Sequence, residues 1–292
     1  MRCATRDLYV ANLSYALPLL LEFCLLVNIV AAEPVQPGWS NEAKGLYASG
    51  KVEEAIGLAT KAIEANVSDT GAYLLRGQFH DRSRHLQKAL ADYNQALKLD
   101  TNLAQAWQLR GLVQFRLAKV KEALADFDRF LELMPDQAPY HWQRGIACYY
   151  AGRFEDGRKQ FELHRKVNPE DVENAVWHFL CVARSSSVEK ARELLMPIKN
   201  DERVPMSQIY SLFAGKVTPE DVLRATEAGE PPPSELRRRL FYAHLYIGLY
   251  LEAIRDRAAY EHIAKAASDY AGGDYMSDVA RLHIKLSEGS RR

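Results

Sequence analysis

The stretch "AWQLRGLVQFRLAKVKEALADFDRFLELMPD", from Ala106 to Asp136, decides the fold. It contains two amphipathic segments with a polar break between them, and no residue with obvious catalytic chemistry. Gly111 lies among bulky side chains in the first segment, and Ala123 is a small residue in the second. Small residues at such positions let two helices approach closely. The stretch therefore predicts a pair of short helices packed against each other.

The same pattern recurs every 34 residues along the chain. The shift relates small, aromatic and proline positions: Gly77, Gly111 and Gly145; Ala89, Ala123 and Gly157; Tyr93, Phe127 and Phe161; Pro135 and Pro169. Four consecutive copies follow, at about residues 36–69, 70–103, 104–137 and 138–171. One helix pair cannot bury its apolar face alone, so neighbouring pairs must stack. A fixed period of this length indicates a solenoid.

The third copy resembles a tetratricopeptide repeat at Trp107, Gly111, Ala123, Phe127 and Pro135. Proline fits the end of the second helix, because it has no N–H to donate and crowds the preceding turn. The resemblance implies an all-α fold, a right-handed α-solenoid of such helix pairs. Divergent helices at the C-terminal end are expected to complete it.

The repeat register predicts the individual helices. The expected pairs are Gly38–Ser49 with Val52–Ala65, Gly71–Ser83 with Leu86–Leu99, Gln105–Leu117 with Val120–Leu133, and Tyr140–Ala151 with Phe154–Val167. Gly50 and Gly152 are expected at the tight turns within two of these pairs.

After Pro169 the pattern weakens. Residues 170–229 are interpreted as a degenerate fifth repeat and an insert of short helices, one of them capped by Thr218. Residues 230–292 are interpreted as a divergent helix pair followed by a capping helix near Ser277–Leu286.

Residues 1–32 differ from the rest of the chain. Arg2 and Arg6 precede a long apolar run, which ends in small residues at Val30 and Ala32. This pattern favours a cleaved secretory signal. The run is also near the length of a membrane span, although it contains Glu22. We therefore expect an exported protein, periplasmic or extracellular, with a retained membrane anchor or an ordinary first helix as alternatives.

Composition and motifs limit the classes of function that we expect. The 292 residues contain 38 basic and 38 acidic side chains, so nothing in the net charge favours nucleic acid or a membrane surface as a partner. Neither a nucleophile elbow nor a zinc-protease motif nor a phosphate loop occurs, so we expect no enzyme activity, no cofactor and no metal site. Cys148 and Cys181 are expected to form either a disulfide or two buried thiols.

The remaining candidate site is the concave face, which the first helix of each repeat lines. Its predicted protein-binding residues are Gln78, Arg82, Gln108, Phe115, Arg116, Trp142, Gln143, Tyr149, Tyr150, Trp177 and Arg184. Aromatic residues mixed with arginine are typical of binding hot spots, and arginine pairs well with carboxylates. The alternative is that these aromatic residues pack against neighbouring helices or a folded-back C-terminal part, with Tyr260 and Tyr270 over the groove.

Three further stretches resemble NlpI-like tetratricopeptide proteins. They are "NAVWHFLCVAR" at 174–184, "FAGKVTPEDVL" at 213–223 and "FYAHLYIGLY" at 241–250. This resemblance implies an exported bacterial scaffold for proteases and cell-wall enzymes, and a homodimer. We therefore predict a non-enzymatic adaptor that binds a protein or peptide in its concave groove, without nucleic acid and with membrane contact only through an uncleaved N-terminal segment. A cell-wall or glycan-binding envelope module is the alternative.

Overall fold

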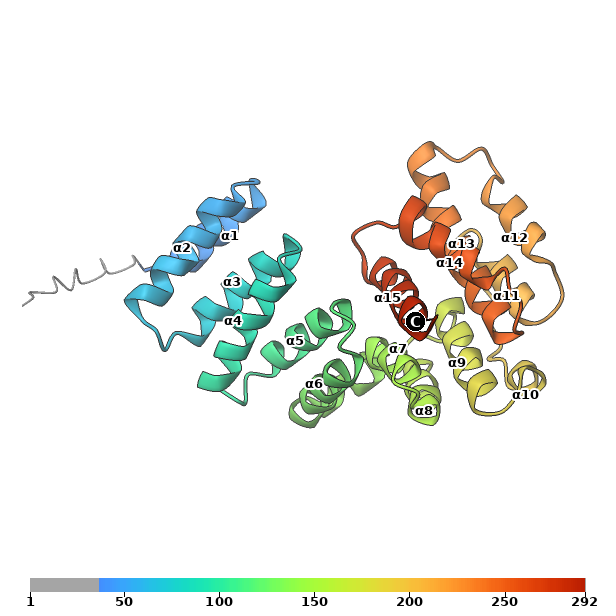
Figure 1. Cartoon of the computed structure of the whole chain (residues 1–292), viewed down its shortest axis with the longest axis horizontal. Helices are drawn as coiled ribbons and strands as arrows, with labels where there is room; N and C mark the ends of the chain where they lie inside the picture. The colour runs from blue at the N-terminus through green and yellow to red at the C-terminus, as the bar shows by residue number, and fades with distance from the viewer. Residues whose placement is uncertain (1–36, 292) are drawn as a thin grey trace, which may run out of the picture.

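The computed structural model describes residues 37–291, and every regular element within this range is a helix (Figure 1). The predicted signal or anchor at residues 1–32 lies outside the described residues. The repeats consist of α1 (Trp39–Ala48), α2 (Val52–Ala65), α3 (Thr70–Arg82), α4 (Leu86–Leu99), α5 (Ala104–Arg116), α6 (Val120–Leu133), α7 (Trp142–Tyr150) and α8 (Phe154–His164). A 3-10 helix, Pro135–Tyr140, joins α6 to α7, so α7 begins two residues later than expected.

The repeating glycines allow the two helices of a pair to touch. A Cβ atom added at Gly111 would lie 2.6 Å from a ring carbon of Phe127. The equivalent pairs, Gly77 with Tyr93 and Gly145 with Phe161, would have the same 2.6 Å contact. The ring on the second helix therefore fills the space that a side chain on the first would need.

The turn within each pair also repeats. Gly50, Arg84, Ala118 and Gly152 have φ values of 82°, 61°, 64° and 74°. The glycine turns are as predicted, because glycine adopts positive φ without a steric penalty. Arg84 and Ala118 hold the same left-handed backbone in spite of their Cβ atoms.

A ladder of arginines links successive repeats. Arg110 on α5 donates two hydrogen bonds of 2.7 Å to Asp126 on α6 and one of 2.9 Å to Asn94 on α4. One repeat earlier, Arg76 bonds Asp92 and Thr60 in the same way, and one repeat later Arg144 bonds Asp128 and Gln160. Each guanidinium thus ties its own second helix to that of the preceding repeat.

The C-terminal half is a larger helical body. It contains α9 (Val172–Ser185), α10 (Val188–Glu193), α11 (Met206–Phe213), α12 (Pro219–Thr226), α13 (Pro233–Ala253), α14 (Ala259–Lys265), a π-helical turn (Ala266–Tyr270) and α15 (Tyr275–Arg291). The capping box at Thr218 and Asp221 is present as expected. No helix among the described residues combines the length and apolar character needed to cross a membrane.

The chain then turns back on itself. Figure 1 shows α15 on the inner side of the superhelix, next to α5 and α7, and α15 contacts α5 directly. The largest buried cluster accordingly joins Phe115 of the third repeat to Leu282 near the C-terminal end. This return decides which part of the concave face is open.

Candidate protein-binding groove

The aromatic part of the concave face is occupied by Tyr275 of α15. Its ring stacks on Phe115 with centroids 5.2 Å apart and meets the ring of Trp142 edge-on at 5.1 Å. Its hydroxyl donates a hydrogen bond of 3.5 Å to the backbone oxygen of Gln143. Phe115 is consequently 0% exposed. Tyr275 thus fills the position that a bound segment would take between α5 and α7.

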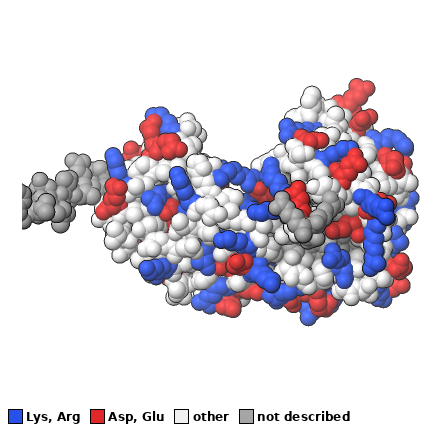
Figure 2. Space-filling view, viewed as in Figure 1, with Lys and Arg blue, Asp and Glu red and all other residues white. Residues whose placement is uncertain are grey.

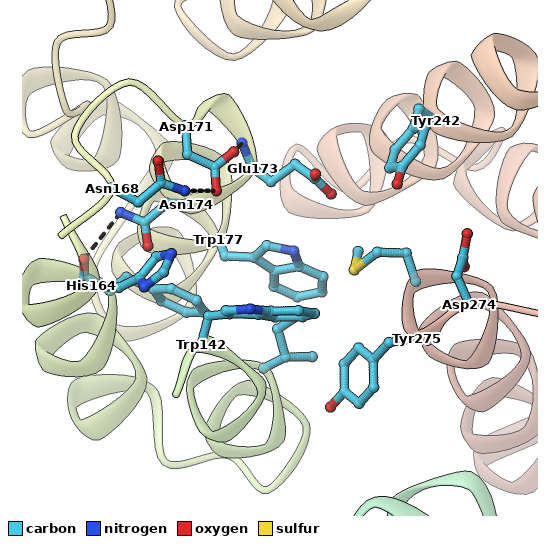
Figure 3. A pocket seen from close by; sticks show the side chains of 13 residues that line it. Trp142, His164, Asn168, Asp171, Glu173, Asn174, Trp177, Tyr242, Asp274 and Tyr275 are labelled. Carbon is cyan, nitrogen blue, oxygen red and sulfur yellow. Dashed lines mark hydrogen bonds between the residues drawn. The ribbon is translucent and has the colours of Figure 1, made fainter. Parts of the chain in front are cut away.

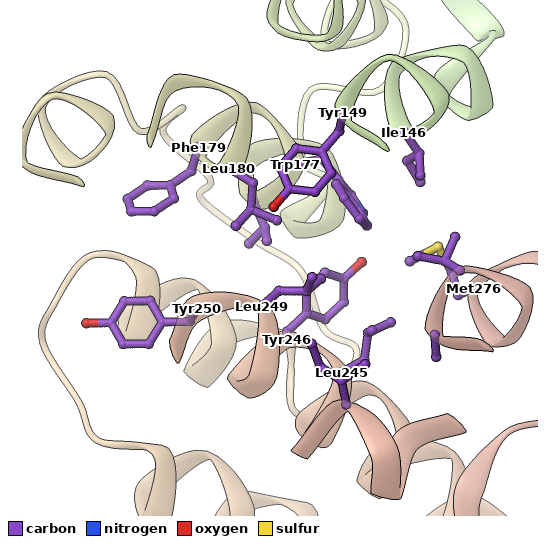
Figure 4. Packing of buried hydrophobic residues seen from close by; sticks show 14 of the residues in the cluster. Ile146, Tyr149, Trp177, Phe179, Leu180, Leu245, Tyr246, Leu249, Tyr250 and Met276 are labelled. Carbon is purple, nitrogen blue, oxygen red and sulfur yellow. The ribbon is translucent and has the colours of Figure 1, made fainter. Parts of the chain in front are cut away.

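Tyr149 and Trp177 are likewise covered. Figure 4 shows both rings directed at Tyr246 of α13, with Met276 of α15 beside them. The Tyr149 and Trp177 rings meet edge-on at 5.4 Å, and both side chains are buried. Burial raises the pKa of the Tyr149 hydroxyl above its usual range.

The expectation of an exposed ligand contact therefore does not match the structure at three predicted positions, Phe115, Tyr149 and Trp177. The physical reason is that α13 and α15 bury them. Two further predicted aromatic residues, Trp142 and Tyr150, are partly buried against the same cluster. Helix α15 covers the groove in place of the two tyrosines proposed for that role, since Tyr270 stacks on His244 and Tyr260 donates to Glu288.

Five charged residues fasten α15 to the repeats, and we call them the arginine clasp: Asp81, Arg84, Arg116, Asp278 and Arg281. Asp278 accepts hydrogen bonds from Arg84 at 2.6 Å, from Arg116 at 2.8 Å and from Arg281 at 3.3 Å. Arg116 also pairs with Asp81. Burial lowers the pKa of Arg116, but Asp81 and Asp278 outweigh this and raise it overall. Three guanidiniums face two carboxylates, so the clasp is cationic.

The N-terminal half of the concave face is open. Figure 2 shows the molecule hollowed between the N-terminal repeats and the C-terminal helices, with Lys and Arg side chains at the floor of the hollow. Helices α1, α3 and α5 face this hollow (Figure 1). Arg84 and Arg281 of the clasp are partly exposed, with 41% and 44% of their side-chain surface accessible.

Three predicted residues lie on the helices of the open half: Gln78 and Arg82 on α3, and Gln108 on α5. Gln78 is half-buried and Arg82 is exposed. Gln108 accepts a hydrogen bond of 2.5 Å from Nε2 of His141. Arg184 lies elsewhere: it is exposed at the end of α9, where its guanidinium stacks over Phe154 at 5.1 Å. The N-terminal predicted residues thus lie on neighbouring repeats, whereas Arg184 lies on α9.

The sequence interpretation missed Arg84, Arg281 and Asp278. Arg84 belongs to the repeating turn, so the 34-residue period marks its position but not its partner. Asp278 and Arg281 lie in a helix outside the repeat register, and no local pattern relates them to α5.

The predictions from the sequence also concern the two cysteines of the described residues and the possible metal-binding groups. Cys148 and Cys181 are free, buried thiols rather than a disulfide. Burial raises the pKa of Cys148 to about 11. Within residues 37–291, no group of three or more His, Cys, Asp or Glu side chains is placed to hold a metal ion.

Comparison with protein families gives two matches, both described as tetratricopeptide repeat. One covers residues 41–104 and the other residues 77–141. They overlap at residues 77–104, which lie almost entirely in the second repeat. None of the curated proteins compared with the chain matches it.

Solved structures share the fold at low identity. A tetratricopeptide repeat protein from Parabacteroides merdae is 18% identical with a TM-score of 0.56, covering 86% of this chain and 97% of that one. YrrB, described as a TPR protein with an unusual peptide-binding site, is 21% identical with a TM-score of 0.53, covering 61% of this chain and 91% of its own. MamA is 15% identical with a TM-score of 0.50 and the same coverage as YrrB.

Proposed function

Since the chain is a tetratricopeptide-repeat protein, we propose that it is a non-catalytic scaffold that binds an extended protein segment along α1, α3 and α5. The observation that carries the proposal is the open hollow on this side of the molecule. A preformed groove binds an extended segment with little ordering of its own side chains.

The charge of the hollow supports an acidic segment. Lys44 and Arg82 are exposed on the first helices and form no ion pair within the described residues. The cationic clasp, with Arg84 and Arg281 partly exposed, joins α15 to α5 and to the turn after α3. Guanidinium groups bind carboxylates in a bidentate geometry, so aspartate, glutamate or a C-terminal carboxylate suits this surface. The fold shared with YrrB, which is described as having a peptide-binding site, is consistent with a peptide partner.

The cellular setting of the proposal comes from sequence patterns. Residues 1–32 favour export, with a membrane anchor as the alternative. The NlpI-like resemblance suggests an envelope protease or cell-wall enzyme as the partner, and a homodimer. The glycan-binding alternative depended on exposed aromatic rings, and burial of Phe115, Tyr149 and Trp177 reduces its support.

Site-specific crosslinking tests the groove with the native partner. A photoreactive benzoylphenylalanine at Gln78 on α3 should crosslink a partner in an extracytoplasmic extract. The same group at Glu53, which is exposed on the second helix α2, is the matched control. A partner crosslinked from position 78 but not from position 53 supports the proposal. Equal crosslinking from both positions, or from position 53 alone, rejects it.

A further inference from the structure

A separate cavity lies on the other side of α15 from the groove, between α7, α9, α13 and α15. It has a volume of about 380 Å³, and its lining includes the aromatic rings of Trp142, Phe161, Trp177, Tyr242 and Tyr275 (Figure 3). This volume is within the usual range of small-molecule sites.

Carboxylates accompany these rings. Asp171, Glu173 and Asp274 line the cavity, and no lysine or arginine is among the described lining residues. Arg203 bonds two of these carboxylates, Asp171 at 2.7 Å and Glu173 at 2.8 Å, and it also bonds Asp201 at 2.6 Å. Asp274 forms no ion pair among the described residues. Negative charge is therefore in excess at this cavity.

The negative charge of Glu173 in particular is not fully balanced by its partners. Tyr246 donates a hydrogen bond of 2.7 Å to one of its oxygens and Arg203 bonds the other. Burial nevertheless raises the pKa of Glu173 above its usual value. A cation placed in the cavity would stabilise this buried carboxylate.

Two buried polar atoms in the cavity wall also lack partners. The Oδ1 atom of Asn174 and the Nε1 atom of Trp177 make no hydrogen bond, although Asn174 is 4% exposed and Trp177 2%. Figure 3 shows the Trp177 nitrogen on the side of its ring toward Glu173. An unpaired acceptor suits an N–H donor, and an unpaired indole N–H suits a carbonyl oxygen. A basic residue within a peptide has both an N–H donor and a backbone carbonyl oxygen.

We propose that this cavity binds the lysine or arginine side chain of a partner polypeptide. The apolar stem lies between Trp142 and Trp177, and the charged end is held by the ring faces and by Asp274 and Glu173. Indole faces attract cations, and the attraction strengthens when water is excluded. The inference goes beyond the proposed function, because it concerns a different surface and stands if the groove binds nothing.

Small blocked amino acids test this directly on the full chain. The probes are N-acetyl-lysine methylamide and N-acetyl-arginine methylamide, with the neutral N-acetyl-norleucine methylamide as the matched control. The readout is the indole ¹⁵N–¹H signal of each of the four tryptophans, assigned with Trp→Phe variants. We expect saturable shifts at Trp142 and Trp177 with a basic probe, and affinity at least about tenfold weaker for norleucine.

Asp274→Asn is the decisive variant, because it removes charge while its amide oxygen still accepts the 2.8 Å hydrogen bond from the Ser277 backbone N–H. The affinity of the protein for N-acetyl-lysine methylamide should fall at least about threefold in this variant. Asp269→Asn, a change at an exposed position outside the cavity, should leave it unchanged. Equal binding of norleucine and lysine, an unaffected Asp274→Asn variant, or no saturable shift at tens of millimolar lysine or arginine probe would each overturn the proposal.

Discussion

Arg116 on α5 donates a hydrogen bond of 2.8 Å to Oδ2 of Asp278 on α15, a residue that follows it by 162 positions. The Asp278 side chain is only 3% exposed. This contact fastens the C-terminal helix to the inner face of the third repeat. It separates the concave face into a covered C-terminal half and an open N-terminal half.

Replacing the shared carboxylate should release α15. Asp278→Asn leaves the buried Arg116 with Asp81 as its one carboxylate partner among the clasp residues, and removing one partner of a buried ion pair costs about 3 kcal/mol. Amide exchange in α15 should therefore become faster, while exchange in α1 and α2 stays as in the wild type. Asp269→Asn, at an exposed position, serves as the control. Unchanged protection of α15 in Asp278→Asn would mean that the clasp does not hold this helix.

The glycine–aromatic contact should be intolerant of one methyl group. In Gly111→Ala the new Cβ would lie 2.6 Å from the Phe127 ring, so the stability should fall by about 1–3 kcal/mol. Gly57→Ala is the matched control: it is also within a helix, but a Cβ there meets nothing within 4 Å. It should be neutral or stabilising by up to about 1 kcal/mol. Urea unfolding of both variants checks the pair, and equal effects would refute the packing argument.

Acid should weaken the fold partly through His141. Burial lowers the pKa of His141 to about 4, while in the unfolded chain it is about 6.5. The unfolded state therefore binds more protons between these values, so the His141 contribution is complete above pH 6.5 and is lost as the pH falls toward 4. Protonation would also break the hydrogen bond that Nδ1 accepts from the Arg144 backbone.

Through His141 alone, the free energy of unfolding near pH 4 should be about 3 kcal/mol lower than at neutral pH. His141→Asn retains an acceptor for the Arg144 N–H but does not titrate. Its urea midpoint should fall less than that of the wild type between pH 7 and 5. Identical pH dependence in the two proteins would show that His141 does not contribute.

The two thiols of the repeats should be unreactive in the folded protein. Burial raises the pKa of Cys148 to about 11 and raises that of Cys181 as well, so almost no thiolate forms at neutral pH. A Cys3→Ser/Cys24→Ser variant restricts labelling by a thiol reagent to these two residues. Both should react only after denaturant is added, without a reducing agent. Rapid labelling of the native protein would contradict their burial.

The repeat part of the fold was predictable because its determinants are local. The 34-residue period marks the glycines, the rings opposite them and the turns at Gly50 and Gly152, and each repeat contacts mainly its neighbours. The arginine ladder obeys the same period, and Arg76 and Asp92 could have been found by comparing copies.

The covered half of the groove was not predictable in this way. An aromatic residue on a first helix, such as Phe115, suits a binding surface and a packing surface equally well. What decides between them is Tyr275, on a helix outside the repeat register. The contact between Asp278 and Arg116 is equally non-local, and no periodicity relates the two positions.

The central claim, that the open N-terminal half binds an acidic segment, is tested most directly by fluorescence anisotropy. The ligand is a short labelled peptide rich in aspartate and glutamate, with its asparagine and glutamine counterpart as the neutral control. Lys44→Glu/Arg82→Glu reverses two exposed charges on the first helices, and Lys61→Glu/Lys98→Glu reverses two on the second helices. The account predicts binding of the acidic peptide alone, weakened at least about tenfold by the first pair and little changed by the second. Equal weakening by both pairs, or equal binding of the neutral peptide, would contradict it.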